Sequence, residues 1–130
     1  MITKKTEYAI KALWELSQNT DNLTTSKEIA QRQAIPPKYL PQIIAALSQA
    51  GLLTSTRGYG GGLKLSRPAE EITLLHVIEA IQGKPKLFEC LLGHFDCDHQ
   101  PQCRLKSVYN KAQDALESVF RRTRLSDVNF

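Results

Sequence analysis

The 130-residue sequence lacks any apolar run near the roughly 18 residues that a membrane-spanning helix requires. Its first residues lead into no apolar core of the kind that defines a signal peptide. It has only 3 cysteines, all within positions 90–103, and this odd, local set excludes the disulfide framework of small secreted domains. We therefore expect a soluble, cytosolic protein with no membrane partner.

Acidic residues are missing from one long stretch of this basic chain, whose net charge is +4. Residues 1–67 hold nine Lys and Arg against four Asp and Glu, a net of +5, whereas residues 68–130 hold eight against nine, a net of −1. Residues 35–67 include Lys38, Arg57, Lys64 and Arg67 but no acid. A surface that lies against phosphates needs cations and excludes carboxylates. The pattern favours nucleic-acid binding by the first half, with chance clustering as the alternative.

Apolar periodicity predicts three helices in this half, over residues 3–18, over 26–33, and from near Lys38 or Tyr39 to Gly51. The third helix is expected to start there because Pro41 is tolerated only in a first turn, where a missing N–H leaves no bond unmade. The segment Thr25-Ser26-Lys27-Glu28 has the capping-box pattern. Two prolines separate the second and third helices, which predicts a helix-turn-helix.

A hairpin follows, because residues 52–56 and 63–66 suit short strands and Arg57-Gly58-Tyr59-Gly60-Gly61-Gly62 suits only a tip. A nucleotide-binding loop is the alternative, but the glycine spacing does not match a P-loop and no helix follows it. The predicted fold is mainly α with a small β-wing: a winged helix-turn-helix plus a long C-terminal dimerisation helix. Residues 1–67 form the predicted DNA-binding region, and residues 68–130 form the cysteine and dimerisation region of one compact unit.

In a winged helix-turn-helix, the third helix enters the major groove with its N-terminal turns. Here those turns present Lys38, Tyr39 and Gln42. The Gln42 amide can pair bidentately with adenine, while Lys38 and Tyr39 can contact phosphate or a base edge. The alternative is that Gln42 is simply solvated.

The predicted wing adds a second set of contacts to double-stranded DNA. Arg57 is the group expected to enter a minor groove, and Gly58 and Gly60 let the backbone approach the duplex. Tyr59 at the tip can stack or form a hydrogen bond.

The longest predicted helix spans residues 104–122 and has an apolar seam. Its members assigned to dimerisation are Leu105, Val108, Tyr109, Ala112, Leu116 and Val119. A helix of this length exceeds what one small core can cover, so the seam predicts a homodimer that matches a pseudo-palindromic operator. The alternative is that it packs against its own domain.

Three cysteines, Cys90, Cys97 and Cys103, are interleaved with His94 and His99. They lack the close C-x-x-C pairs usual in zinc sites, and they fit an iron–sulfur cluster with a fourth ligand of another type. Three unremarkable thiols are the alternative. A cysteine enzyme with a histidine base is disfavoured, because no oxyanion device is evident.

The segment from Ile2 to Ile10, the wing tip, the cysteine segment, the long helix and the closing Leu125-Ser126-Asp127-Val128 resemble the Rrf2 family of bacterial regulators. The resemblance covers nearly the whole chain. It implies a homodimeric winged helix-turn-helix transcription factor of the bacterial cytoplasm and nucleoid, commonly a repressor, with the long helices at the dimer interface. For the sensing members it also implies a 2Fe–2S or 4Fe–4S cluster, which responds to iron, redox state or nitric oxide.

Family resemblance places the cluster ligands at Cys90, Cys97 and Cys103. NsrR-like members take the fourth ligand from the first helix of the other subunit, at the position of Glu7, with His94 or His99 as alternatives here. IscR-like members use a histidine three residues after the last cysteine, where this chain has Lys106. Other members, such as those like CymR, have no cluster. The alternative is therefore a regulator of the same fold that responds to thiol oxidation, zinc, a metabolite or a protein partner.

Overall fold

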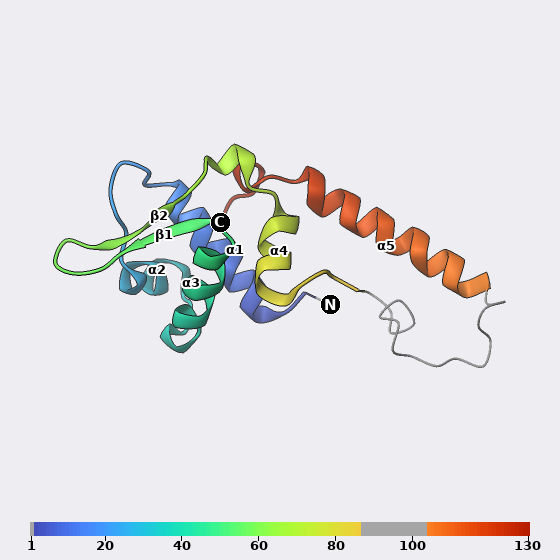
Figure 1. The fold of residues 1–130 in the computed structure, drawn as a ribbon, viewed down its shortest axis with the longest axis horizontal. Coiled ribbons are helices and arrows are strands. Elements are labelled where there is room, and N and C mark those ends of the chain that lie inside the picture. The colour runs from blue at the N-terminus through green and yellow to red at the C-terminus, as the bar shows by residue number, and fades with distance from the viewer. Residues whose placement is uncertain (1, 87–103) are drawn as a thin grey trace.

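The fold is taken from a computed structural model that describes residues 2–86 and 104–130. Its helices are α1 (Lys4–Ser17), α2 (Ser26–Gln33), α3 (Leu40–Gln49), α4 (Leu74–Gln82) and α5 (Arg104–Arg122), with 3-10 turns η1 (Pro37–Tyr39), η2 (Ala69–Glu71) and η4 (Leu125–Asp127). Strands β1 (Leu53–Thr56) and β2 (Gly62–Leu65) pair antiparallel, with Leu53 opposite Leu65 and Thr56 opposite Gly62. The predicted fold class, mainly α with one small hairpin, is confirmed (Figure 1).

Side-chain caps fix where the helices begin. At α2, the Thr25 hydroxyl accepts the Glu28 N–H (3.2 Å) and the Glu28 carboxylate accepts the Thr25 N–H (2.9 Å), which confirms the predicted capping box. The helix ends at Gln33, and its C-cap Ala34 has a left-handed φ of 52°. The chain is thereby turned toward α3, and Ile35 enters the core.

The start of the third helix differs from the prediction. Residues Pro37–Tyr39 form the turn η1, in which the Tyr39 N–H donates to the Pro36 carbonyl (3.1 Å), and the α-helix begins only at Leu40. Pro41 has no N–H and lies in the first turn with either start, so it does not distinguish the two. The predicted residues Lys38 and Tyr39 are helical, but they form the tighter 3-10 turn that often precedes an α-helix.

One hydrophobic core joins α1, α2, α3, α4, both strands and η4, and it contains no residue of α5. It is built around Ala9, Leu13 and Leu16 of α1, and it continues from the first half of the chain into the second through Ile72, Val77 and Leu125. The last of these is reached because the chain returns to the core after α5. The predicted boundary at residue 67 therefore separates two functional regions that share one hydrophobic core.

Helix α5 projects from this body, and its C-terminal end lies near α4 (Figure 1). Among the described residues, no helix combines the length and the hydropathy needed to cross a lipid bilayer.

Candidate functional site: nucleic-acid interface and cysteine segment

The turn η1 and helix α3 are held against α1 by aromatic packing. The half-buried ring of Tyr39 lies against that of Tyr8, with centroids 5.3 Å apart. The Lys38 ammonium lies 5.2 Å from the centre of the Tyr39 ring and is exposed. Leu40, Ile43 and Leu47 bury the opposite side of α3 in the core. Lys38 of η1 and Gln42 of α3 are therefore exposed to solvent on elements that are packed against α1 and the core, while Tyr39 exposes only part of its side chain.

A contact that the sequence did not predict joins α1 to the exposed side of α3. The Lys5 ammonium donates to the Gln42 side-chain carbonyl across 3.0 Å. The sequence alone does not indicate this contact, because the two residues lie 37 positions apart. Only the packing of α1 against α3 brings them together.

The wing is anchored at its base and open at its tip. Leu63 of β2 exchanges two backbone hydrogen bonds with Thr24, at 2.8 and 3.0 Å, which attaches the hairpin to the segment before α2. At the tip, Arg57 and Tyr59 are exposed, the latter fully. Gly58 and Gly60 adopt φ values of +94° and +78°, which favour glycine. The predicted tip residues thus lie together on a projecting loop, and Gly62 belongs to β2 rather than to the tip.

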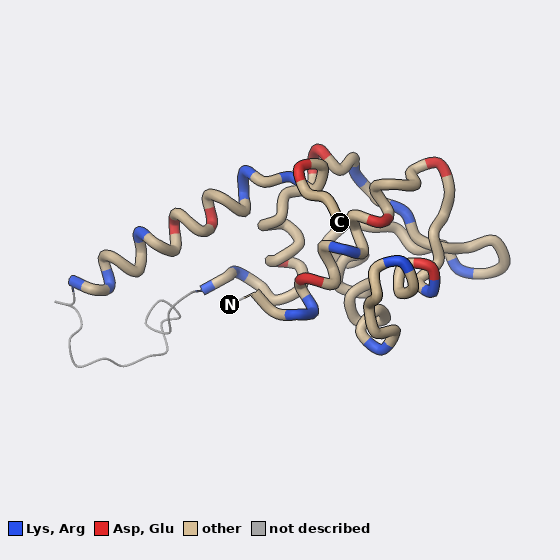
Figure 2. Tube along the Cα trace, turned by 180° about the vertical axis from the view of Figure 1, so that it is seen from behind, with Lys and Arg blue, Asp and Glu red and all other residues tan. Residues whose placement is uncertain are grey.

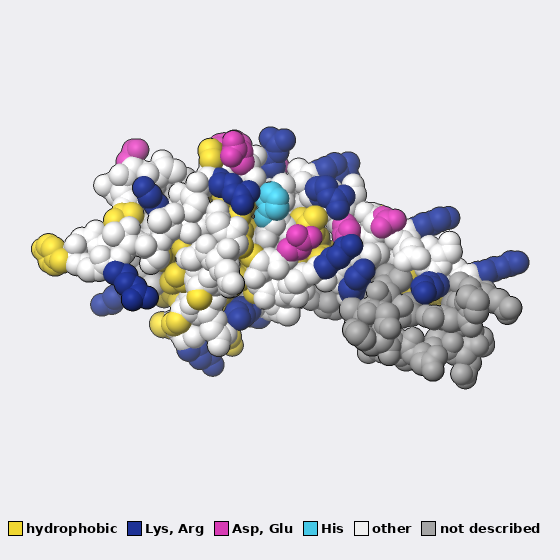
Figure 3. All heavy atoms as spheres, viewed as in Figure 1, with side chains coloured by type: hydrophobic (Ala, Val, Ile, Leu, Met, Phe, Trp, Pro, Cys, Tyr) yellow, Lys and Arg dark blue, Asp and Glu magenta, His cyan; other side chains and the backbone are white. Residues whose placement is uncertain are grey.

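Charge is distributed unevenly over this part of the molecule. In Figure 2, the wing and the segment leading into α3 carry blue positions without red, while α5 carries both signs. Figure 3 shows the same asymmetry on one face, where Lys and Arg groups lie beside the wing and below it without an Asp or Glu group between them. The surface made by residues 35–67 is free of acids, as the sequence requires.

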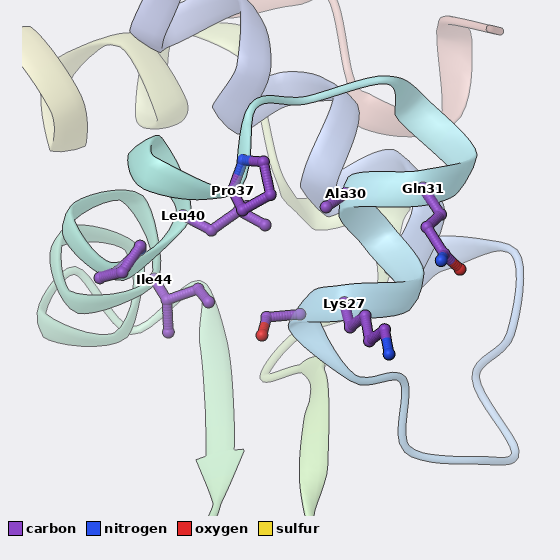
Figure 4. A pocket seen from close by; sticks show the side chains of 8 residues that line it. Lys27, Ala30, Gln31, Pro37, Leu40 and Ile44 are labelled. Atoms are coloured by element: carbon purple, nitrogen blue, oxygen red, sulfur yellow. The ribbon is translucent and has the colours of Figure 1, made fainter.

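A crevice of about 370 Å³ lies between α2 and α3. Figure 4 shows Pro37, Leu40 and Ile44 on the α3 side, facing Ala30 of α2 across it. Lys27 and Gln31, which are not among the predicted DNA-contacting residues, lie on the α2 side. Their i, i+4 spacing on the polar face of a short helix was the available signal. They extend the polar rim of the surface beyond α3.

The predicted apolar seam of α5 is largely uncovered in the single chain. Leu105, Val108 and Val119 are 51%, 58% and 52% exposed, whereas Tyr109, Ala112 and Leu116 are half-buried. Large exposed apolar side chains along one helix form the kind of patch that marks an interaction site.

The buried side of α5 is polar, which the apolar periodicity of the sequence does not predict. Gln113 and Glu117 are 4% and 8% exposed, and the Gln113 amide donates to the Glu117 carboxylate (3.0 Å) and to the Pro85 carbonyl. Lys84 and Arg121 lie 4.0 and 3.7 Å from the same carboxylate. The spacing of 113, 117 and 121 by four residues was the available signal.

The predicted cluster ligands fall largely outside the described part of the chain: Cys90, Cys97, Cys103, His94 and His99 all lie in residues 87–103. Within residues 2–86 and 104–130, no group of three metal-ligating side chains occurs. Glu7 is described, in the first turn of α1, where its half-exposed carboxylate lies 3.2 Å from the Lys4 ammonium. An exposed ion pair of this kind contributes about 0–1 kcal/mol, so Glu7 is free to change partner at little cost.

The end of α1 that carries Glu7 lies beside the end of α4. The Gln82 side-chain carbonyl of α4 accepts from the Thr6 hydroxyl (2.6 Å) and from the Thr3 N–H (3.1 Å). The chain continues from α4 into the segment that holds the cysteines. The cysteines themselves lie outside the described residues. By residue type, three thiols and a carboxylate suit iron better than calcium or magnesium, which prefer oxygen ligands.

Three helices, a tight turn and a basic hairpin define a winged helix-turn-helix DNA-binding protein. The Rrf2 family model, described as "Iron-dependent Transcriptional regulator", matches residues 2–129, and the chain belongs to this family of transcriptional regulators. The regulator NsrR of Oceanobacillus iheyensis is 33% identical over 129 residues, which cover 98% of this chain and 88% of that protein.

Two solved structures confirm the fold. The structure of T. potens IscR superposes with a TM-score of 0.77 at 31% identity and covers 98% of this chain and 84% of its own. CymR, described as the global cysteine regulator of B. subtilis, gives a TM-score of 0.79 at 28% identity. This match covers 98% of this chain and 94% of the CymR chain. The winged-helix prediction and the family resemblance are thus confirmed, and DNA is supported as the partner.

Proposed function

We propose that the chain is a homodimeric regulator that binds a pseudo-palindromic operator, with α3 in the major groove and the wing in the adjoining minor groove. The observation that carries this proposal is that residues 35–67, which form α3 and the wing, contain basic residues and no acidic residue. Both elements expose side chains that can contact DNA. In this proposal the protein regulates transcription without catalysing a reaction. It acts in the cytoplasm and on the nucleoid, where it represses transcription from the operator that it binds.

Each DNA contact has a role that follows from its placement. Gln42 reads a base edge, and Lys38 together with the exposed part of Tyr39 binds phosphate. In the wing, Arg57 enters the minor groove and Tyr59 packs at its rim, while Gly58 and Gly60 keep the tip narrow. Residues 1–67 would then supply the DNA contacts, and residues 68–130 the control and pairing of the two copies.

The DNA-binding proposal is tested by measuring duplex affinity at increasing salt concentration. We expect the affinity of wild type to fall steeply, and the salt slope of Arg57→Ala to be smaller by about 1, because one cation no longer displaces counterions. Lys111→Ala removes the same charge from the exposed surface of α5 and should leave the slope unchanged. A wild-type affinity that does not depend on salt would contradict the proposal.

The signal-sensing part of the proposal is an iron–sulfur cluster bound by Cys90, Cys97 and Cys103. Glu7 of the other subunit supplies the fourth ligand, with His94 or His99 as alternatives. The fit rests on the donor set: three thiols, which iron–sulfur clusters require, and a carboxylate whose ion pair with Lys4 is exposed and weak. When bound, the cluster would supply a centre sensitive to iron supply, redox state and nitric oxide.

Anaerobic purification followed by an absorption spectrum and iron analysis tests this assignment. We expect visible charge-transfer bands, their loss when Cys90, Cys97 or Cys103 is replaced by Ala, and a changed spectrum in Glu7→Gln. Iron-loaded and iron-free protein should differ in operator affinity. Equal affinities would contradict control by the cluster, although they would leave DNA binding intact.

A second candidate is a regulator of the same fold without a cluster. It is favoured by the likeness to CymR, which is described as a cysteine regulator. In that case the purified protein is colourless and free of iron, and oxidation of its thiols, zinc, a metabolite or a partner protein changes its operator affinity.

A further inference from the structure

We propose that Lys5 determines base specificity: together with Gln42 it forms a reading unit that presents only hydrogen-bond donors and selects guanine rather than adenine. This inference rests on the proposed insertion of α3 into the major groove. It assigns a base preference to the site and gives a role to a residue of α1.

The orientation of the Gln42 amide follows from the chemistry of its partner. A lysine ammonium has three donors and no acceptor, so the group that faces Lys5 Nζ at 3.0 Å is the Gln42 carbonyl oxygen Oε1. The amide nitrogen Nε2, with its two N–H donors, is directed away from Lys5. Gln42 is exposed, so this nitrogen is available to a base.

Lys5 is held in place by its own turn of α1. Thr6, the next residue, is fully buried, and its hydroxyl donates to the Gln82 side chain across 2.6 Å. Tyr8, one turn further, packs on Tyr39 at the start of α3. The acid of this turn, Glu7, pairs with Lys4, and in the part of the chain that the structure describes Lys5 has no carboxylate within ion-pair distance. Its charge therefore acts on Gln42.

The base preference follows from what the pair offers. A glutamine whose Oε1 and Nε2 are both available matches adenine, which presents the acceptor N7 and the donor N6–H₂ in the major groove. With the Lys5 ammonium on Oε1, the outward groups are N–H donors of both residues. Guanine presents two acceptors, N7 and O6, and matches this set, whereas the amino group of adenine would face a cation.

The competing role for Lys5 is a contact to phosphate, which carries no sequence information. The two roles predict different losses. A phosphate contact, when removed, weakens binding to all sequences alike and lowers the salt slope by about 1. A specificity residue, when removed, changes the ratio between two bases at one position.

The test begins with selection of binding sites from random duplexes by the full-length protein, purified anaerobically with matched iron content. Wild type, Lys5→Met, Gln42→Ala and the control Lys11→Met are compared, and duplexes that differ only as G or A at the selected position are then titrated. Lys11 also lies on α1, but its ammonium lies over the ring of Phe130, 5.8 Å from the ring centre. The control removes the same charge from another side of the helix.

We expect wild type and Lys11→Met to favour guanine over adenine at one position by roughly 5- to 150-fold, the range for a good bidentate contact. Lys5→Met should lose or reverse that ratio, and the double variant Lys5→Met/Gln42→Ala should match Gln42→Ala, since the two residues act as one unit. An unchanged ratio in Lys5→Met, with uniformly weaker binding, overturns the inference alone. Failure of folded wild type to bind any duplex overturns the proposed function and this inference with it.

Discussion

The side-chain amide of Gln113 on α5 donates to the backbone carbonyl of Pro85, just after α4, and Pro85 itself is buried. This bond ties the projecting helix to the point at which the chain leaves for the cysteine segment. The same amide supports Glu117, so one side chain satisfies two buried acceptors. Such a group is costly to remove, because a buried polar atom without a partner retains its desolvation penalty.

Gln113→Ala is expected to lower the free energy of unfolding by about 1–3 kcal/mol, since the Pro85 carbonyl and the Glu117 carboxylate each lose a donor. Urea denaturation at fixed protein concentration measures this change. Asp114→Ala, one position along α5 and exposed, should have little effect. Equal effects of the two substitutions would show that the buried amide is not the stabilising group.

Val108→Asp is expected to dissociate the proposed dimer. Val108 is 58% exposed in the single chain and lies on the apolar seam, so a partner helix would bury it, and a buried carboxylate without a partner is strongly unfavourable. Sedimentation equilibrium should show a dimer for wild type and a monomer for this variant. Asn110→Asp adds the same charge at an exposed polar position of α5. If Val108→Asp stays dimeric, the seam is not the interface.

Gly61→Ala is expected to weaken DNA binding through the wing. A Cβ atom there would lie 2.2 Å from the Thr56 carbonyl oxygen and 2.9 Å from that of Gly58, so the tip must open to admit it. The core does not include the tip, and the melting temperature should therefore change little while duplex affinity falls. Ser55→Ala, at an exposed position of β1, serves as the control in the same anisotropy titration. Wild-type affinity in Gly61→Ala would exclude a role for the tip conformation.

The parts of the fold that local chemistry governs were predictable from the sequence. The capping box at Thr25, the glycine-rich hairpin tip and the 19-residue helix that begins at Arg104 each follow from neighbouring residues. The contacts that depend on tertiary packing were not. Gln42 was correctly expected on the exposed side of α3, but its bond to Lys5 requires two helices far apart in sequence. The hydrogen bond from Gln113 of α5 to the Pro85 carbonyl was not predictable for the same reason, because the two residues lie 28 positions apart.

Leu125→Ala is expected to destabilise the DNA-binding region although it lies 58 residues beyond the predicted boundary at residue 67. Leu125 is fully buried in the core that α1 organises, and its backbone N–H donates to the Ile72 carbonyl across 2.7 Å. Truncation removes core contacts and leaves a cavity, which costs about 2–5 kcal/mol. Ser126→Ala, the exposed neighbour, is the matched control. Urea denaturation of both variants should show one cooperative transition, shifted only in Leu125→Ala, because residues 1–67 share their core with the end of the chain. A wild-type midpoint for Leu125→Ala would mean that the first 67 residues are stable without that contact.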